Sequence, residues 1–382
     1  MDIKYFDHSA TTPIDKSVLQ EMVPYLKDSF GNPSSSYDLG KKNKEAINLA
    51  RMKIATLINS KVNEIYFTSG GSESDNMIIK GIAIANRRRG NHIITSTIEH
   101  PAVLNSMKYL EKCGFKVTYL RPRENGIINI EDLKKHLTKS TILVSIMFVN
   151  NEIGTIQPIK EIGTICRKYG IFFHTDAVQA MGYVNVDVKE YNIDALSMSS
   201  HKFYGPKGIG VSYIKENVSF VNLIDGGHQE RDRRAGTENV AGIVGTAKAL
   251  ENAYKNMNEN NKKIKALRDY YIVEIKRRIP YIKINGDLKD RVVTNANISF
   301  AGIVGDELLK ELNKDGICVS SGSACSAGFV NPSHVLLSLG LSKNLSKAAV
   351  RVTFGKDNTR EETEFLIDKV EEGVNKLRKK AK

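Results

Sequence analysis

Lys202 lies in a turn that is rich in hydroxyl groups, imidazole and glycine. The turn belongs to residues 197–210, which read SMSSHKFYGPKGIG. The apolar runs at 194–198 and 209–214 predict two neighbouring buried strands, so the lysine follows a strand end, where open α/β sheets bind ligands. A lysine amine can form a Schiff base with an aldehyde cofactor, and Ser199 and His201 can donate hydrogen bonds to a phosphate. The alternative is a solvated lysine in a hairpin loop, because S-x-H-K alone is a weak signal.

Asp176 lies just past the apolar strand pattern of residues 171–174, with Gln179 behind it. A carboxylate in such a place needs a cationic partner, because an unpaired buried charge is costly. A protonated pyridine nitrogen would provide that partner, and the ion pair would keep the ring electron-poor. A salt bridge or a helix cap is the alternative. His100 could stack on such a ring and shuttle protons, although a histidine before Pro101 also suits the start of a helix.

Residues 64–76 read EIYFTSGGSESDN, a short apolar strand followed by two glycines and a helix start. Ser72 and Asp75 have the spacing of a capping box. Gly70 and Gly71 allow a sharp turn, and the free amides of the helix start, with the Ser72 hydroxyl, can hold an anion. An ordinary capped helix is the alternative. The segment is neither a Walker loop nor G-x-G-x-x-G, so nucleotide binding is not favoured.

The four cysteines, at 113, 166, 318 and 325, form no C-x-x-C pair and lack the spacing of a zinc site. We therefore expect neither a disulfide framework nor an intrinsic metal site. Cys318 alternates with apolar neighbours and is predicted to be buried in a strand. Cys325 lies in SSGSACSAG, residues 320–328, where small residues leave the loop free to move. A reactive thiol is favoured there over an incidental cysteine, because accessible free thiols are a liability.

Two other segments carry charge in informative places. Residues 226–239 read GGHQERDRRAGTEN, which is too polar for a core and is interpreted as a functional loop. Arg351 is flanked by apolar residues in the predicted strand 348–355 and could bind a substrate carboxylate. A structural ion pair is the competing interpretation of Arg351.

The elements that position these residues alternate between strand and helix. Strand patterns at 92–96, 117–120, 142–148 and 171–174 are separated by helical patterns that begin at 101, 130 and 159. This βαβ alternation predicts a mostly parallel sheet with helices on both faces. A long helical pattern from 243 to 278 then leads into a smaller second domain, with a strand at 296–300 and a helix at 305–315.

The composition is that of an ordinary globular protein of two domains, with 382 residues and a formal charge of +13. No basic leader and no long uncharged apolar run is visible, so we expect a cytoplasmic protein without a membrane partner. The densest basic runs, at 41–44, 87–89 and 376–382, are not interleaved with aromatic residues. Non-specific attraction to acidic partners is therefore favoured over specific nucleic-acid recognition.

Together these segments resemble the pyridoxal-phosphate-dependent cysteine desulfurases of the NifS/IscS type, in the class V aminotransferase group of fold-type I enzymes. The likeness runs from YFDHSATTP at 5–13 through 68–76, VNNEIG at 149–154, 201–210 and 320–325 to Arg351. Several motifs in register are more specific than any one of them. The resemblance implies an α/β fold, with a mostly parallel central sheet in a large domain, 13–253, and a smaller α+β domain formed by 1–12 and 254–382.

The resemblance also implies site roles. Lys202 would be the Schiff-base lysine and Cys325 the thiol that takes sulfur from L-cysteine, leaving L-alanine. Asn151 and Arg351 would position the substrate. The cofactor residues implied are Gly71, Ser72, His100, Asn151, Asp176, Gln179, Ser199, His201, Lys202 and, from the second subunit of a homodimer, Thr237. Asp232 departs from the glycine common at its position.

The implied partner is an iron–sulfur scaffold or another sulfur acceptor, and Cys325 could transiently bind an iron–sulfur cluster together with it. The alternatives are a selenocysteine lyase or another class V aminotransferase, although an aminotransferase would not need Cys325. An alternative outside enzymology is a basic nucleic-acid-binding protein on an inactive enzyme fold, against which intact Lys202, Asp176, His100 and Cys325 argue.

Overall fold

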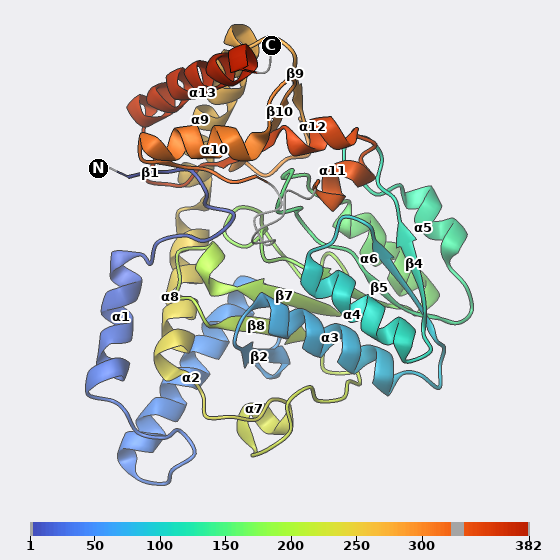
Figure 1. Cartoon of the computed structure of the whole chain (residues 1–382). Helices are drawn as coiled ribbons and strands as arrows, with labels where there is room; N and C mark the ends of the chain where they lie inside the picture. The colour runs from blue at the N-terminus through green and yellow to red at the C-terminus, as the bar shows by residue number, and fades with distance from the viewer. Residues whose placement is uncertain (1–2, 322–331, 381–382) are drawn as a thin grey trace.

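The computed structural model describes residues 3–321 and 332–380. A seven-stranded sheet, in the order β2-β8-β7-β6-β5-β3-β4, organises the larger part of the molecule (Figure 1). Its strands are β2 (Ile65–Thr68), β3 (His92–Ser96), β4 (Lys116–Leu120), β5 (Thr141–Ser145), β6 (Phe172–Asp176), β7 (Ala195–Ser199) and β8 (Gly210–Ile214). The pairs from β4 through β3, β5 and β6 to β7 are parallel, whereas β8 is antiparallel to both β7 and β2. The predicted mostly parallel sheet is confirmed.

Helices cover both faces of this sheet, because successive strand residues bury their side chains on opposite sides. Phe67, Val144 and Phe173 pack on one face against α1 (Lys16–Lys27), α2 (Asp38–Leu57), α5 (Ile130–His136), α6 (Ile159–Tyr169) and α8 (Val240–Lys255). Tyr66 and Leu143 pack on the other face against α3 (Gly71–Ala85) and α4 (Pro101–Lys112). A 3-10 turn, η1 (Val62–Glu64), leads into β2. The core of the larger part therefore lies in two layers, one on each side of the sheet.

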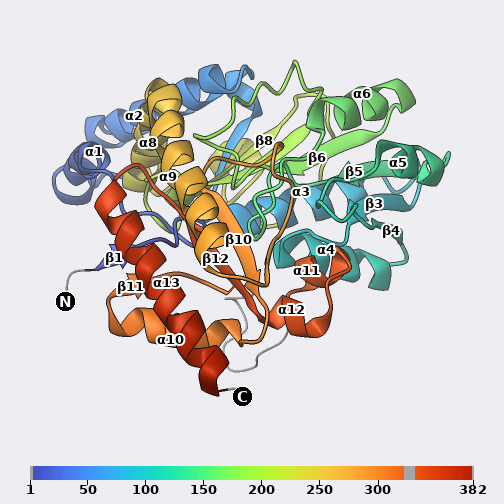
Figure 2. The same ribbon diagram turned by 90° about the horizontal axis from the view of Figure 1, so that it is seen from above.

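A second core lies at the other end of the molecule (Figures 1 and 2). It contains the antiparallel sheet of β9 (Ile282–Ile284), β10 (Asn295–Phe300) and β12 (Ala349–Thr353), and the parallel pair β1 (Lys4–Tyr5) and β11 (Ile317–Cys318). The helices α9 (Met257–Arg278), α10 (Gly305–Lys314) and α13 (Arg360–Lys380) cover these strands, and α11 (His334–Ser338) and α12 (Lys343–Lys347) lie toward the large sheet. This mixed composition is the expected smaller α+β part. The boundaries at 12/13 and 253/254 stay a prediction.

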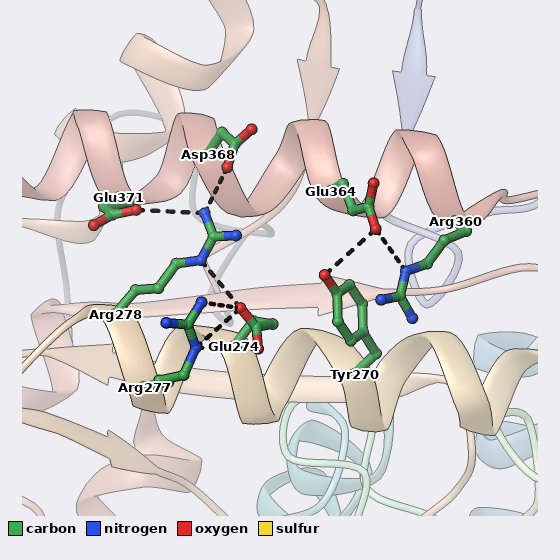
Figure 3. A network of polar contacts seen from close by, with 8 residues as sticks. All are labelled: Tyr270, Glu274, Arg277, Arg278, Arg360, Glu364, Asp368 and Glu371. Carbon is green, nitrogen blue, oxygen red and sulfur yellow. Dashed lines mark hydrogen bonds and ion pairs between the residues drawn. The ribbon is translucent and has the colours of Figure 1, made fainter.

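Helices α9 and α13 lie side by side and are linked by a polar network (Figure 3). Arg278 of α9 contacts Glu274 of its own helix and Asp368 and Glu371 of α13, at 3.2, 2.5 and 3.5 Å. Tyr270 of α9 also donates a hydrogen bond to α13. Because exposed ion pairs stabilise weakly, the buried apolar faces of the two helices contribute most of the packing energy.

Two sequence-based expectations about the elements are wrong. The helical pattern 243–278 is divided at Asn256, which follows the last residue of α8 and whose ψ of 7° departs from the helical value. Cys318 is only half-buried, because β11 is two residues long and pairs with β1 alone. Within the described residues, no helix has the length and apolarity that crossing a bilayer requires.

Candidate active site

A cavity of about 990 Å³ opens where β3, β5, β6 and β7 end, at the junction with the smaller part of the molecule. Parallel strands bring their carboxyl ends to one edge of a sheet, so side chains that follow different strands meet there. Ten of the predicted site residues line this cavity: Gly71, Ser72, His100, Asn151, Asp176, Gln179, Ser199, His201, Lys202 and Arg351. The structure therefore brings together residues that are up to 280 positions apart in the chain.

Two predicted residues are not among them. Thr237 is exposed on the loop before α8 and does not line the cavity of its own chain. Cys325 lies outside the described residues. The chain on either side of the undescribed segment is nevertheless fixed at the cavity, because Ser320 and Arg351 exchange two backbone hydrogen bonds and Ser333 lines the cavity wall.

Lys202 ends the 3-10 turn η2 (Ser200–Lys202), which directly follows β7. Its Nζ donates to the carbonyl oxygens of Ser9 and Ala10, both at 2.6 Å. The Thr12 hydroxyl fastens this N-terminal segment by donating to the carbonyl of His201 at 2.9 Å. The motif at 5–13 therefore acts through backbone carbonyls, which side-chain patterns do not reveal.

The start of α3 forms one wall of the cavity. Gly70 precedes the helix without a side-chain cap, so the predicted capping box of Ser72 and Asp75 is wrong. Ser72 instead lies in the first turn of the helix, with the first-turn amides that have no partner within the helix. A Cβ on Gly71 would lie 2.8 Å from Val178 Cγ2, so glycine is required for this close packing. The wall is therefore a narrow, donor-rich cradle that suits an anion.

Asp176 is buried at the end of β6, and its Oδ1 accepts the backbone N–H of Val178 at 2.9 Å. Burial raises the pKa of this carboxyl, against the opposing effects of His100 and Lys202. A cation placed in the cavity beside Asp176 would favour its ionised form. Asp176 therefore suits a positively charged ring nitrogen.

His100 caps α4, where its Nδ1 accepts the N–H of Ala102 at 3.1 Å. Burial lowers the pKa of the imidazole, so the ring is neutral near pH 7 and its proton resides on Nε2. Gln179 donates to the Ser9 carbonyl at 2.9 Å, on the same side of the cavity as Lys202. Both side chains are thus held in place by backbone groups.

Arg351 of β12 is buried, and its side chain has two partners. It donates to Asp7 at 2.7 Å and to the carbonyl of Asn151 at 2.9 Å. Its Nε has no hydrogen-bond partner among the described residues. A buried unsatisfied guanidinium nitrogen is costly, and a carboxylate is the partner that a guanidinium group binds best. Arg351 therefore forms the structural ion pair with Asp7 and still has one nitrogen, Nε, without a partner among the described residues.

Two buried carboxyls to which the sequence assigned no role lie at this end of the sheet: Glu152 lines the cavity, and Glu99 contacts Met147, which also lines it. Glu99 accepts the Ser96 hydroxyl at 2.5 Å and the Met147 N–H, and burial raises its pKa to about 8. Glu152 accepts the Ser333 hydroxyl at 2.5 Å, and burial raises its pKa to about 7. The only sequence signal for either was its place after a predicted strand. No group of three or more His, Cys, Asp or Glu in the described part of the chain could hold a metal ion.

Comparison with known proteins gives the geometry its context. Residues 4–366 match the family described as Aminotransferase class-V. The chain is 54% identical over 366 residues to "Cysteine desulfurase IscS" of Clostridium botulinum strain Hall, covering 95% of this chain and 92% of that protein. The same name belongs to a Methanosarcina thermophila protein that is 51% identical over 374 residues, covering 98% and 92%.

Solved structures agree with these relatives. A "NifS-like protein" superposes with a TM-score of 0.92 at 38% identity, covering 97% of this chain and 99% of that one. A structure titled "SspA in complex with cysteine" gives a TM-score of 0.82 at 38% identity, covering 93% and 100%. The chain therefore belongs to the Aminotransferase class-V family and, within it, to the cysteine desulfurases of the NifS and IscS type.

Proposed function

We propose that this protein removes sulfur from L-cysteine, releases L-alanine and retains the sulfur as a persulfide on Cys325 for transfer to acceptors. The observation that carries the proposal is the convergence of Lys202, Asp176 and Arg351 on one cavity. The chain flanking Cys325 is fixed to the wall of the same cavity. The relatives named cysteine desulfurase support the same reaction.

The cavity suits pyridoxal phosphate as the cofactor. Lys202 would bind its aldehyde, and Asp176 would face its ring nitrogen. The cradle residues Gly71 and Ser72, with Ser199 and His201, would hold the phosphate; Gln179 would bind the ring oxygen and His100 would stack on the ring. When bound, this cofactor withdraws electrons from the Cα of an amino acid. The fit rests on the donor-rich cradle at the start of α3 and on the buried carboxyl of Asp176, whose pKa burial raises.

Arg351 and Asn151 would orient the substrate. The free Nε of Arg351 would bind the L-cysteine carboxylate, while its contacts with Asp7 and the Asn151 carbonyl keep the guanidinium in place. Orientation of this kind contributes strongly to rate, because it removes rotational freedom before the reaction. The cysteine-bound structural relative is in keeping with such a pocket.

Lys202 would remove the Cα proton of the substrate. After it takes the proton, its ammonium group can donate to the carbonyls of Ser9 and Ala10, which lie 2.6 Å from Nζ. Two carbonyl acceptors stabilise the charged form of an amine. The N-terminal segment thus helps Lys202 to act as the base.

Cys325, as a thiolate, would attack the sulfur of the substrate, so that an S–S bond forms while the Cβ–S bond of the substrate breaks and its electron pair stays with the carbon that becomes the methyl group of L-alanine. Cys325 is five residues from Ser320, which is fixed to Arg351, and five residues span at most about 18 Å. A connection of this length allows the Cys325 thiol to approach the cavity, which the proposed transfer requires. The acceptor we propose is an iron–sulfur scaffold or another sulfur-carrying protein, with Cys325 as a transient cluster ligand at most.

We also propose a homodimer in which Thr237 of each subunit completes the phosphate site of the other. Leu19, Val23 and Leu26 share one face of α1 and are 48%, 45% and 64% exposed, and Phe30 beyond the helix is 78% exposed. A second copy that covers this face would remove apolar area from water.

The cysteines that the structure describes are unpaired, in keeping with a reducing cytoplasm.

The test is release of sulfide and alanine from L-cysteine with a thiol reductant. We expect equal amounts of both products from the parent protein. Lys202→Ala should lack the yellow Schiff base, and Cys325→Ala should bind the cofactor but release no sulfide. Cys318→Ala, which removes a half-buried thiol of the described part of the chain, is the matched control. If Cys325→Ala matched the parent, the persulfide role would be wrong.

A further inference from the structure

The loop of residues 225–239 is fixed to its own subunit by a buried ion pair. Arg51 of α2 donates from both terminal nitrogens to Glu230 at 2.7 Å, and the two side chains are 7% and 3% exposed. Glu230 also accepts the N–H of Phe67 in the edge strand β2, at 2.9 Å. The expectation that this loop is too polar for the core is therefore wrong at Glu230, because Arg51 neutralises the buried carboxylate.

The backbone beside this ion pair is strained. In α7 (Gln229–Asp232), the φ angles of Glu230, Arg231 and Asp232 are 45°, 59° and 64°. The left-handed region is disfavoured for non-glycine residues by about 1–2 kcal/mol each. Such a conformation persists only where surrounding contacts hold it. The loop shape is thus imposed by its contacts rather than by its own preference.

A second ion pair connects the same loop to the cradle. Arg234 donates from Nε and a terminal nitrogen to Glu73, at 2.8 and 3.1 Å, with the side chains 21% and 12% exposed. Glu73 lies in the first turn of α3, next to Ser72, and also accepts the N–H of Ser69 at 2.8 Å. The Glu73 carboxylate therefore binds both the turn at Ser69, which leads into α3, and Arg234 of the 225–239 loop.

Thr237 follows Arg234 by only three residues, which span at most about 10 Å. Where Arg234 is held therefore limits where Thr237 can lie. Thr237 is exposed in its own chain, whereas Glu73 lines the cavity of that chain. The ion pair thus links Glu73, which lines the cavity of its own subunit, to the loop that carries Thr237, which is exposed and can contact a second subunit.

We propose that the Arg234–Glu73 ion pair is the positioning element that places Thr237 for the partner subunit, and so couples the two cofactor sites of the dimer. The inference rests on the proposed function, in which Thr237 binds the partner's cofactor phosphate. Arg234 and Glu73 are positioning residues: their effect on the partner's site is exerted through Thr237.

The experiment uses mixed dimers of two differently tagged chains, one of which carries Lys202→Ala. Only the other chain can then form the yellow Schiff base, so absorbance reports a single site. The charge-neutral pair of changes Glu73→Gln and Arg234→Met is placed either on the Lys202→Ala chain, in trans to the yellow site, or on the yellow chain itself. The cofactor is removed and titrated back, and its affinity is measured.

In trans, we expect the double variant to weaken cofactor binding roughly tenfold, the order of one lost hydrogen bond to a charged group. In cis, we expect a smaller loss than in trans, because the side-chain oxygen of the glutamine in Glu73→Gln can still accept the N–H of Ser69 and the charge near the cradle stays balanced. Arg233→Met is the matched control: Arg233 stacks on Phe220 and donates to its carbonyl, and should leave the affinity unchanged.

Thr237→Ala in trans separates this inference from the function beneath it. If Thr237→Ala weakens binding while the double variant in trans does not, the coupling through Arg234 and Glu73 is wrong and the shared site stands. Equal losses in cis and in trans would also overturn the coupling, because they indicate a purely structural ion pair. If Thr237→Ala in trans leaves the cofactor affinity unchanged, both the coupling through Arg234 and Glu73 and the shared phosphate site are wrong.

Discussion

Replacing Arg351 by lysine tests whether its guanidinium binds the substrate carboxylate. The structure gives this side chain two fixed partners, Asp7 and the Asn151 carbonyl, and leaves Nε without a partner among the described residues. A lysine can keep a charge near Asp7 but cannot present a fork of planar donors. The substitution therefore removes substrate binding more completely than it removes the ion pair.

The magnitude follows from the number of bonds lost. A carboxylate bound by the one guanidinium nitrogen that has no partner among the described residues, Nε, gains about 1.5–3 kcal/mol from this charge-assisted hydrogen bond. We therefore expect a loss of roughly 1.5–3 kcal/mol in transition-state stabilisation. Since each 1.36 kcal/mol is a factor of ten, kcat/KM for L-cysteine should fall by about 10- to 150-fold.

The assay compares L-cysteine with its methyl ester, which lacks the carboxylate charge. The parent protein should discriminate strongly against the ester, and Arg351→Lys should discriminate little, while its cofactor absorbance stays that of the parent. Asp7→Asn is the control for the structural pair and should change the preference for L-cysteine by less than about tenfold. If Arg351→Lys kept the parent's preference for L-cysteine over the ester, Arg351 would serve only the ion pair with Asp7.

Three further outcomes follow from the buried groups. Asp176→Asn should still bind the cofactor through Lys202 but form alanine roughly ten- to a thousandfold more slowly, because the charge that holds a proton on the ring is gone; a parent-like rate would exclude the proposed partner of the ring nitrogen. Arg51→Met leaves Glu230 buried without its cation and should lower the free energy of unfolding by about 3–5 kcal/mol, measured by urea denaturation; an unchanged midpoint would contradict this. Burial raises the pKa of Glu99 to about 8, so the folded state binds the proton more tightly than the unfolded state. Below the unfolded pKa both states are protonated, and stability then falls as pH rises toward about 8. Glu99→Gln should flatten that fall in thermal unfolding, and an unaltered pH profile would show that Glu99 is ionised in the folded protein.

Much of this site could be predicted from the sequence, because its side chains follow strands whose apolar runs are easy to recognise. Asp176 and Lys202 each follow a buried strand, and parallel pairing brings the ends of β6 and β7 to one edge. The predicted strand 92–96 has the same first and last residues as β3, because its apolar run is equally clear. Side-chain type and strand position together were sufficient for these residues.

The rest depends on contacts that a local pattern does not contain. The carbonyls of Ser9 and Ala10 hold Lys202 across more than 190 residues, and any residue type carries such a carbonyl. The capping box predicted at Ser72 is absent because α3 begins at Gly71, so that Gly70 and not Ser72 is the residue before the helix. Glu230 looked too polar to be buried, because its partner Arg51 is 179 residues away.

The central claim is that Cys325 takes sulfur from L-cysteine in the cavity that contains Lys202. The most direct test is mass spectrometry of the protein after brief exposure to L-cysteine without a reductant, followed by alkylation and digestion. The account predicts that the peptide with Cys325 gains the mass of one sulfur atom, and that Lys202→Ala abolishes the gain. Sulfur on Cys318 or Cys113 instead, or a gain at Cys325 that persists in Lys202→Ala, would contradict it.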